Sequence, residues 1–91
     1  MAKLKASEIK AALAQVPAWK RRGAVISRKF EFKDFVGAMK FVNAVAKAAE
    51  KAQHHPDIDI RWNKVTLALT THSEGGLTKK DFQMAAKIDA L

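Results

Sequence analysis

Hydrophobic residues near the start of the chain recur at the spacing of an amphipathic helix. Ile9, Leu13 and Val16 stand at i, i+4 and i+7, which places them on one face of a helix from about Lys5 to Val16. Pro17 disfavours the helical conformation of the residue before it, so the helix is expected to end there. This segment is predicted to cover an apolar surface.

From Trp19 onward the pattern changes to alternation of apolar and polar residues. Residues 19–22 and 24–32 are predicted to form a β-hairpin, with the turn at Arg22-Gly23. Ile26, Phe30 and Phe32 share one parity in the second strand. We expect that face to point into the core.

Helical spacing returns after Asp34, which stands at the N-cap position of a helix over about residues 34 to 53. Its apolar stripe is predicted to comprise Phe35, Ala38, Phe41, Val42, Val45, Ala49 and Ala52. Small residues occupy the other sides, among them Ala44, Ala46 and Ala48. They would allow a second surface to approach closely, which makes a helix-mediated oligomer a reasonable hypothesis.

Pro56 ends this helix and pushes His55 into an extended conformation. Beyond it, Ile58, Ile60 and Trp62 follow one parity, whereas Val65, Leu67, Leu69 and Thr71 follow the other. This switch predicts a second hairpin with a turn or bulge near Asn63-Lys64. Thr70 and His72 would lie on its less apolar face.

The last helix is predicted to follow a loop over residues 73–76. Thr78 and Asp81 have the spacing of a capping box, with Asp in place of Glu or Gln. The buried stripe is expected to contain Leu77, Met84, Ala85, Ile88 and Leu91. Asp81 falls on this stripe, and it is either a helix cap or an inward-facing functional group.

The order of elements is helix, hairpin, helix, hairpin, helix. It predicts one α+β domain over residues 1–91, with a four-stranded antiparallel sheet and three helices on one face (α-β-β-α-β-β-α).

Composition excludes several classes of function. The chain has no cysteine, so disulfides and thiolate chemistry are excluded. No apolar run reaches the ~18 residues of a membrane span, and the N-terminus lacks a signal-peptide core. A cytoplasmic protein without membrane contact is therefore expected.

The net charge of +8 raises nucleic acid as a partner. The basic residues are scattered, however, and Lys20-Arg21-Arg22 is the only run. Lys33, Lys40 and Lys47 recur every seven residues on one helix face, which a solvated surface explains. We therefore do not expect nucleic acid to be a partner.

All three histidines, His54, His55 and His72, lie within 19 residues. Imidazole both donates and accepts protons near neutrality, so two rings from different elements could flank one substrate as acid and base. A zinc site is disfavoured because adjacent histidines diverge and structural zinc usually recruits thiolates. Three unrelated surface histidines remain the alternative from the residues alone.

A longer pattern surrounds these histidines. Glu50 is followed after three residues by His54-His55-Pro56, after five more by Trp62, after nine more by His72 and after eight more by Asp81. In this spacing, and almost end to end, the chain resembles the pterin-4a-carbinolamine dehydratase family.

The resemblance implies a hydro-lyase, 4a-hydroxytetrahydrobiopterin dehydratase, that forms quinonoid dihydropterin and water by histidine acid-base catalysis. This activity would serve the recycling of tetrahydrobiopterin used by aromatic amino acid hydroxylases. Neither a metal nor a cofactor is implied, because the pterin is the substrate. The implied catalytic residues are His54, His55 and His72, the implied substrate-binding residues are Gln53, His54, His55, Thr70, Thr71, His72 and Ser73, and supporting roles fall to Glu50, Trp62 and Asp81.

The family resemblance further implies a homodimer or homotetramer. Its main alternative function is that of a non-catalytic binding module, since some animal members serve as dimerisation cofactors for a transcription factor. The resemblance implies that His54 and His72 form the acid-base pair and that His55 chiefly binds the substrate. His54 is the better candidate to protonate the leaving hydroxyl, because a helix C-terminus favours the charged imidazole.

Overall fold

The computed structural model describes residues 2–91. Its elements follow the predicted order, with one additional 3-10 turn near the end: α1 (Ala6–Gln15), β1 (Lys20–Arg22), β2 (Val25–Glu31), α2 (Phe35–Ala52), β3 (Asp57–Arg61), β4 (Lys64–Leu69), η1 (His72–Glu74) and α3 (Lys79–Asp89). The predicted boundaries of the helices and of both hairpins are confirmed to within a few residues.

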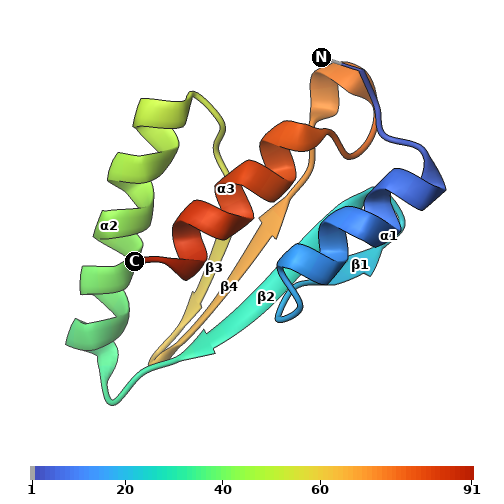
Figure 1. Ribbon diagram of the computed structural model, residues 1–91. Helices are drawn as coiled ribbons and strands as arrows, with labels where there is room; N and C mark the ends of the chain where they lie inside the picture. Colours follow the sequence, from blue (N-terminus) through green and yellow to red (C-terminus); the bar gives the residue numbers. More distant parts are fainter. Residues whose placement is uncertain (1) are drawn as a thin grey trace.

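The four strands form one antiparallel sheet in the order β1-β2-β4-β3. Each hairpin supplies one central and one edge strand, and the central pair β2–β4 joins them through a register that places Arg28 opposite Leu67. All three helices lie on the same face of this sheet (Figure 1). The predicted α+β architecture with helices on one face is confirmed.

The core lies between the sheet and the helices. Alternate residues of the central strands point into it, among them Ile26, Leu67 and Leu69, each at most 1% exposed. We call the opposite, uncovered side of the sheet the open face, which carries Ser27, Lys29, Glu31, Asp57, Asp59, Arg61, Lys64, Thr66 and Ala68. The alternation in the sequence thus separates a buried side from a solvated side.

The predicted cap of α2 is present, since Asp34 Oδ1 accepts a hydrogen bond of 2.8 Å from the backbone N–H of Gly37. At the start of α1, Lys5 occupies a position where Ser or Thr is usual. Here the backbone N–H of Lys5 donates to Glu8 Oε1 at 2.8 Å. The carboxylate three residues into the helix therefore satisfies a donor at the helix start.

Two residues of the predicted apolar stripes are exposed instead. Phe35, the first residue of α2, is 49% exposed and Leu91 is 56% exposed. Leu91 lies beyond the end of α3 at Asp89, so the helical spacing no longer determines its direction. The remaining predicted stripe of the last helix, with Leu77, Met84, Ala85 and Ile88, is buried as expected.

The second hairpin turns earlier than predicted. Its turn consists of Trp62 and Asn63, and Trp62 has a positive φ of 51°. The backbone of Trp62 has thus left the strand, and its side chain is 65% exposed. The parity switch in the sequence arose from this two-residue turn.

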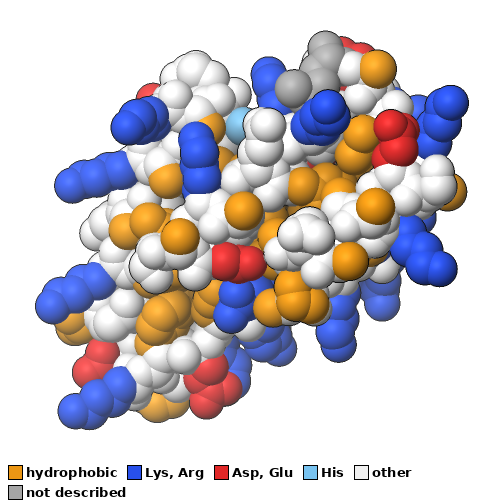
Figure 2. All heavy atoms as spheres, in the orientation of Figure 1, with side chains coloured by type: hydrophobic (Ala, Val, Ile, Leu, Met, Phe, Trp, Pro, Cys, Tyr) orange, Lys and Arg blue, Asp and Glu red, His pale blue; other side chains and the backbone are white. Residues whose placement is uncertain are grey.

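Basic side chains are spread widely over the visible surface (Figure 2). Lys33, Lys40 and Lys47 are all exposed, as expected for a solvated stripe. None of the helices in residues 2–91 combines the length and the apolar character needed to cross a bilayer.

Candidate functional site

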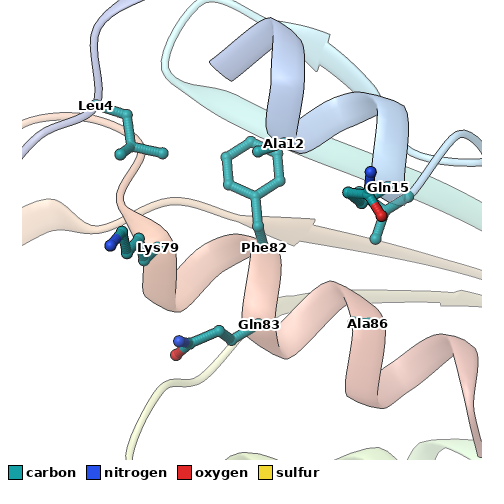
Figure 3. Close-up of a pocket in the computed structure, with 8 residues that line it drawn as sticks. Leu4, Ala12, Gln15, Lys79, Phe82, Gln83 and Ala86 are labelled. Atoms are coloured by element: carbon teal, nitrogen blue, oxygen red, sulfur yellow. The ribbon is translucent and has the colours of Figure 1, made fainter. Parts of the chain in front are cut away.

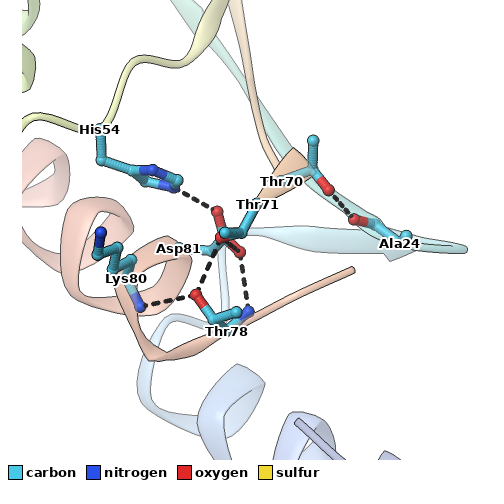
Figure 4. Close-up of polar contacts among 7 residues, drawn as sticks. All are labelled: Ala24, His54, Thr70, Thr71, Thr78, Lys80 and Asp81. Carbon is cyan, nitrogen blue, oxygen red and sulfur yellow. Dashed lines mark hydrogen bonds and ion pairs between the residues drawn. The ribbon is translucent and has the colours of Figure 1, made fainter. Parts of the chain in front are cut away.

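The imidazole of His54 and the carboxylate of Asp81 form the centre of the candidate site. His54 Nε2 lies 2.6 Å from Asp81 Oδ1, although the two residues are 27 positions apart in the sequence. The Asp81 side chain is fully buried, and the His54 side chain is 12% exposed. The contact therefore joins an interior carboxylate to a histidine that still reaches the surface (Figure 4).

The other oxygen of Asp81 is bound by two further donors. Oδ2 accepts from the backbone N–H of Thr78 at 2.9 Å and from the hydroxyl of Thr71 at 2.8 Å. A buried carboxylate is costly unless hydrogen bonds replace its hydration. With donors from a backbone amide, a hydroxyl and an imidazole, Asp81 meets this condition.

The hydroxyl hydrogens in this network have a consistent arrangement. Thr71 Oγ1 and Thr78 Oγ1 lie 2.9 Å apart. Because Thr71 uses its single hydroxyl hydrogen on Asp81, Thr78 must donate to Thr71. Thr78 Oγ1 in turn accepts from the backbone N–H of Lys80 at 3.2 Å. Every hydrogen in the network thus has one acceptor (Figure 4).

The start of α3 places Asp81. Thr78 is the N-cap and Asp81 the third residue of the helix, and together they form the capping box that the sequence predicted. The same carboxylate also faces His54. The two interpretations of Asp81, a cap or an inward-facing group, therefore both hold.

Thr71 reaches this network because the chain folds back after β4. The backbone groups of Thr71 and Gly76 bond to each other at 3.2 and 3.3 Å, and η1 fills the space between them. Gly75 has a φ of 71°, a conformation that glycine adopts without steric cost. This reversal brings the end of β4 next to the start of α3.

The end of α2 places His54. Gln53, the C-cap residue, is in the left-handed region with a φ of 52°, and its side-chain amide donates to the backbone oxygen of Glu50 at 2.7 Å. The backbone N–H of His54 bonds to the oxygen of Ala49 at 3.1 Å. These bonds turn the chain inward, toward α3.

His55 points to a different partner. Its Nε2 contacts Glu50 Oε2 on the last turn of α2, and both side chains are more than half exposed. Of the predicted site residues, the structure therefore brings together Glu50 with His55 and, separately, His54 with Thr71 and Asp81.

His72 and Ser73 lie on the surface in η1, immediately after the buried Thr71. Thr70 points the other way, because its hydroxyl donates to the backbone oxygen of Ala24 at 2.6 Å. The predicted segment 70–73 thus has one residue in the network, one tied to the first hairpin and two free at the surface.

Trp62 lies at the opposite end of the second hairpin from His54. The five residues of β3 separate them, which at about 3.3 Å per residue is roughly 17 Å of extended chain. Within this chain its side chain is therefore remote from the network around Asp81.

A small cavity of about 180 Å³ adjoins His54. It is lined by Ala52 and His54 from the end of α2 and by Lys80, Gln83, Met84 and Lys87 from α3. Sequence analysis missed the four residues of α3, although their spacing on one helix face was available as a signal. His54 is thus shared between the network around Asp81 and the wall of this cavity.

A second hollow lies between α1 and α3 and is unrelated to the histidines. It measures about 280 Å³ and is lined mostly by apolar side chains, including Leu4 and Phe82 (Figure 3). No group of three or more potential metal ligands of the His, Cys, Asp and Glu types occurs among residues 2–91.

The fold and the site define an α+β protein with a buried carboxylate-imidazole pair, an arrangement suited to proton transfer. Comparisons with known proteins identify the family. The family model described as Pterin 4 alpha carbinolamine dehydratase matches residues 2–91. A relative from Acidobacterium capsulatum that carries the pterin-4-alpha-carbinolamine dehydratase name is 57% identical over 91 residues, covering 100% of this chain and 99% of its own.

A second relative with this name, from a Picosynechococcus species, is 52% identical over 85 residues, covering 93% of this chain and 92% of its own. The crystal structure of a transcriptional coactivator/pterin dehydratase from Brucella melitensis superimposes with a TM-score of 0.92 at 40% identity, covering 97% and 96% of the two chains. The chain therefore belongs to the pterin-4a-carbinolamine dehydratase family, a family of hydro-lyases.

Proposed function

We propose that this chain dehydrates a 4a-hydroxytetrahydropterin, with 4a-hydroxytetrahydrobiopterin from aromatic amino acid hydroxylation as the reference substrate. In the reaction the N5–H bond breaks, the C4a–O bond breaks and a C4a=N5 double bond forms. The products are quinonoid dihydropterin and water. The reaction needs one group to take the N5 proton and one to protonate the departing hydroxyl.

The observation that carries the proposal is the hydrogen bond between His54 and Asp81 in a chain that matches the family over residues 2–91. A carboxylate only accepts hydrogen bonds, so His54 Nε2 carries a hydrogen and Nδ1 is left for exchange with the substrate. Among the described residues no group bonds to Nδ1, and the only buried side-chain polar atom without a partner is Asn63 Oδ1. Nδ1 therefore contacts solvent.

In the proposed mechanism the doubly protonated ring of His54 gives its Nδ1 proton to the leaving hydroxyl and becomes neutral, and a neutral His72 takes the N5 proton. His72 suits this role because it is exposed and directly follows Thr71, whose hydroxyl binds the same carboxylate as His54. His55, held beside Glu50, chiefly binds the substrate. Gln53, Thr70, Thr71 and Ser73 are proposed to line the pterin site around these three rings.

The test is direct. The purified protein is mixed in a stopped-flow instrument with freshly generated 4a-hydroxytetrahydropterin, and the absorbance of the quinonoid product is followed. Catalysed loss of the carbinolamine at a rate proportional to protein concentration is expected. A rate equal to that of the buffer alone would refute the proposed activity.

Self-association through β3 is also proposed. β3 is an edge strand, and Ile58 and Ile60 on it are 39% and 37% exposed, next to unpaired backbone groups. Such an edge is a template for pairing with a second copy. Light scattering after size exclusion should give at least twice the mass of one chain for the natural protein and a lower mass for Ile60→Asp.

A further inference from the structure

The cavity beside His54 has a pronounced positive charge. Lys80 and Lys87 are seven residues apart on α3, which is close to two helical turns, and Gln83 lies between them on the same side. Within residues 2–91 neither ammonium group lies within 4.0 Å of a carboxylate. Asp81, the acidic residue next to Lys80 in sequence, is turned away into its own buried network.

His54 itself is part of the cavity wall. Figure 4 shows the side chain of Lys80 on the same side of α3 as the His54 ring, and both residues line the cavity. Figure 2 shows a small histidine surface with basic side chains nearby. A molecule bound against the His54 ring would therefore have this cavity beside it.

The size of the cavity limits what it can hold. At about 180 Å³ it is smaller than the ~300–1,000 Å³ typical of a site for a complete ligand. It has room for one substituent of a larger molecule. The two ammonium groups and the Gln83 amide offer hydrogen-bond donors, which suit the oxygens of a phosphate or carboxylate.

The geometry points to an anion-binding subsite: Lys80, Gln83 and Lys87 bind a phosphate or carboxylate on the side chain of the pterin whose ring lies against His54. This inference rests on the proposed dehydratase function. It assigns the enzyme a preference for carbinolamines with a charged side chain over those with a neutral one.

The experiment compares two 4a-hydroxytetrahydropterins that differ only in a phosphate on the side chain. The measured quantity is the ratio of kcat/KM for the phosphorylated substrate to kcat/KM for the neutral one. The natural enzyme is expected to give a ratio of about ten or more, the size of one charge-assisted hydrogen bond. The ratio should fall as ionic strength rises, because salt screens partly exposed charges.

The double variant Lys80→Gln, Lys87→Gln should lower this ratio about tenfold, chiefly through KM of the phosphorylated substrate. Lys10→Gln, Lys47→Gln is the matched control, because it removes two exposed helix lysines that lie outside the cavity. The control is expected to keep the ratio of the natural enzyme. Equal ratios in the natural enzyme and the Lys80, Lys87 variant would overturn the subsite while leaving the dehydratase function in place.

Inorganic phosphate distinguishes a substrate substituent from a free anion. If the cavity takes the substituent, phosphate should compete with the phosphorylated substrate only. A change in turnover of the neutral substrate with added phosphate would overturn the assignment to a substituent. An enzyme that dehydrates neither substrate would refute the proposed function and the subsite together.

Discussion

His54 Nε2 and Asp81 Oδ1 lie 2.6 Å apart, and this contact connects the end of α2 with the start of α3. Asp81 also caps α3 and binds Thr71 at the end of β4. One buried carboxylate thus holds three elements together and orients one imidazole. The same atoms therefore affect both stability and the proposed chemistry, and the predictions below separate the two.

Asp81→Asn tests the orientation of the His54 ring. The amide oxygen can still accept from Thr78, but the amide nitrogen then faces His54 Nε2, which must become an acceptor. We expect the hydrogen of the neutral ring to move to Nδ1 and kcat to fall roughly 10²-fold with little change in KM. Nitrogen NMR shifts of the histidine report the tautomer. An unchanged kcat with a changed tautomer would contradict the role given to Asp81.

His72→Ala tests the proposed base without disturbing the core. The side chain is exposed and makes no hydrogen bond to residues 2–91, so the free energy of unfolding should change by less than about 0.5 kcal/mol. We expect kcat to fall by about 10²- to 10⁴-fold. Chemical denaturation and the stopped-flow assay measure the two effects.

His54→Ala is the counterpart of that variant. A similar loss of kcat is expected, together with a loss of ~1–3 kcal/mol in stability, because Asp81 is left buried with one donor fewer. If either histidine variant kept near-normal turnover, the acid-base assignment would be wrong.

Asp89→Ala should lower stability without affecting the site. Asp89 Oδ1 accepts from Trp19 Nε1 at 2.8 Å and from Arg28 at 2.6 Å, and Trp19 is only 3% exposed. Removal of the carboxylate leaves the indole N–H without a partner, at a cost of about 1–3 kcal/mol. Urea denaturation followed by tryptophan fluorescence measures the loss.

Its control is Asp57→Ala at an exposed position of β3, which should change stability by no more than about 0.5 kcal/mol. Both variants should retain kcat/KM. A selective loss of kcat in the Asp89 variant would connect this ion pair to the site.

Trp62→Asn tests whether Trp62 supports the site. The residue has a φ of 51°, a conformation that costs most side chains ~1–2 kcal/mol and that Asn adopts more readily. We expect equal stability or a gain of up to about 1 kcal/mol, with kcat/KM changed less than twofold. A tenfold loss of kcat/KM would show that Trp62 does support the functional site.

Local patterns predicted most of the fold, because helix spacing, strand alternation and capping depend on neighbours a few residues away. Asp34 and Thr78 began their helices as predicted, and Pro56 separated α2 from β3. Predictions that lay at the ends of elements were less accurate. Phe35 and Leu91 matched a stripe but are exposed at the start of α2 and beyond the end of α3, and Trp62 belongs to a turn.

The residues of the candidate site could be named from their types and spacing, but the contacts between their side chains could not be predicted. Spacing cannot show that Asp81 faces His54 while His55 faces Glu50, because adjacent histidines point to different sides once the helix has ended. The catalytic roles of all three histidines stay predictions that the variants above test.

The sequence by itself determined the order of the elements, the acid-base chemistry available and the resemblance to a family, because these follow from residue types and short intervals. Only the tertiary structure decided that Asp81 binds His54 and Thr71 and that a cavity with two lysines adjoins His54. Those contacts depend on how α3 packs against the end of α2 and the end of β4. That packing depends on the whole folded chain, so the spacing of residues within a short segment cannot predict it.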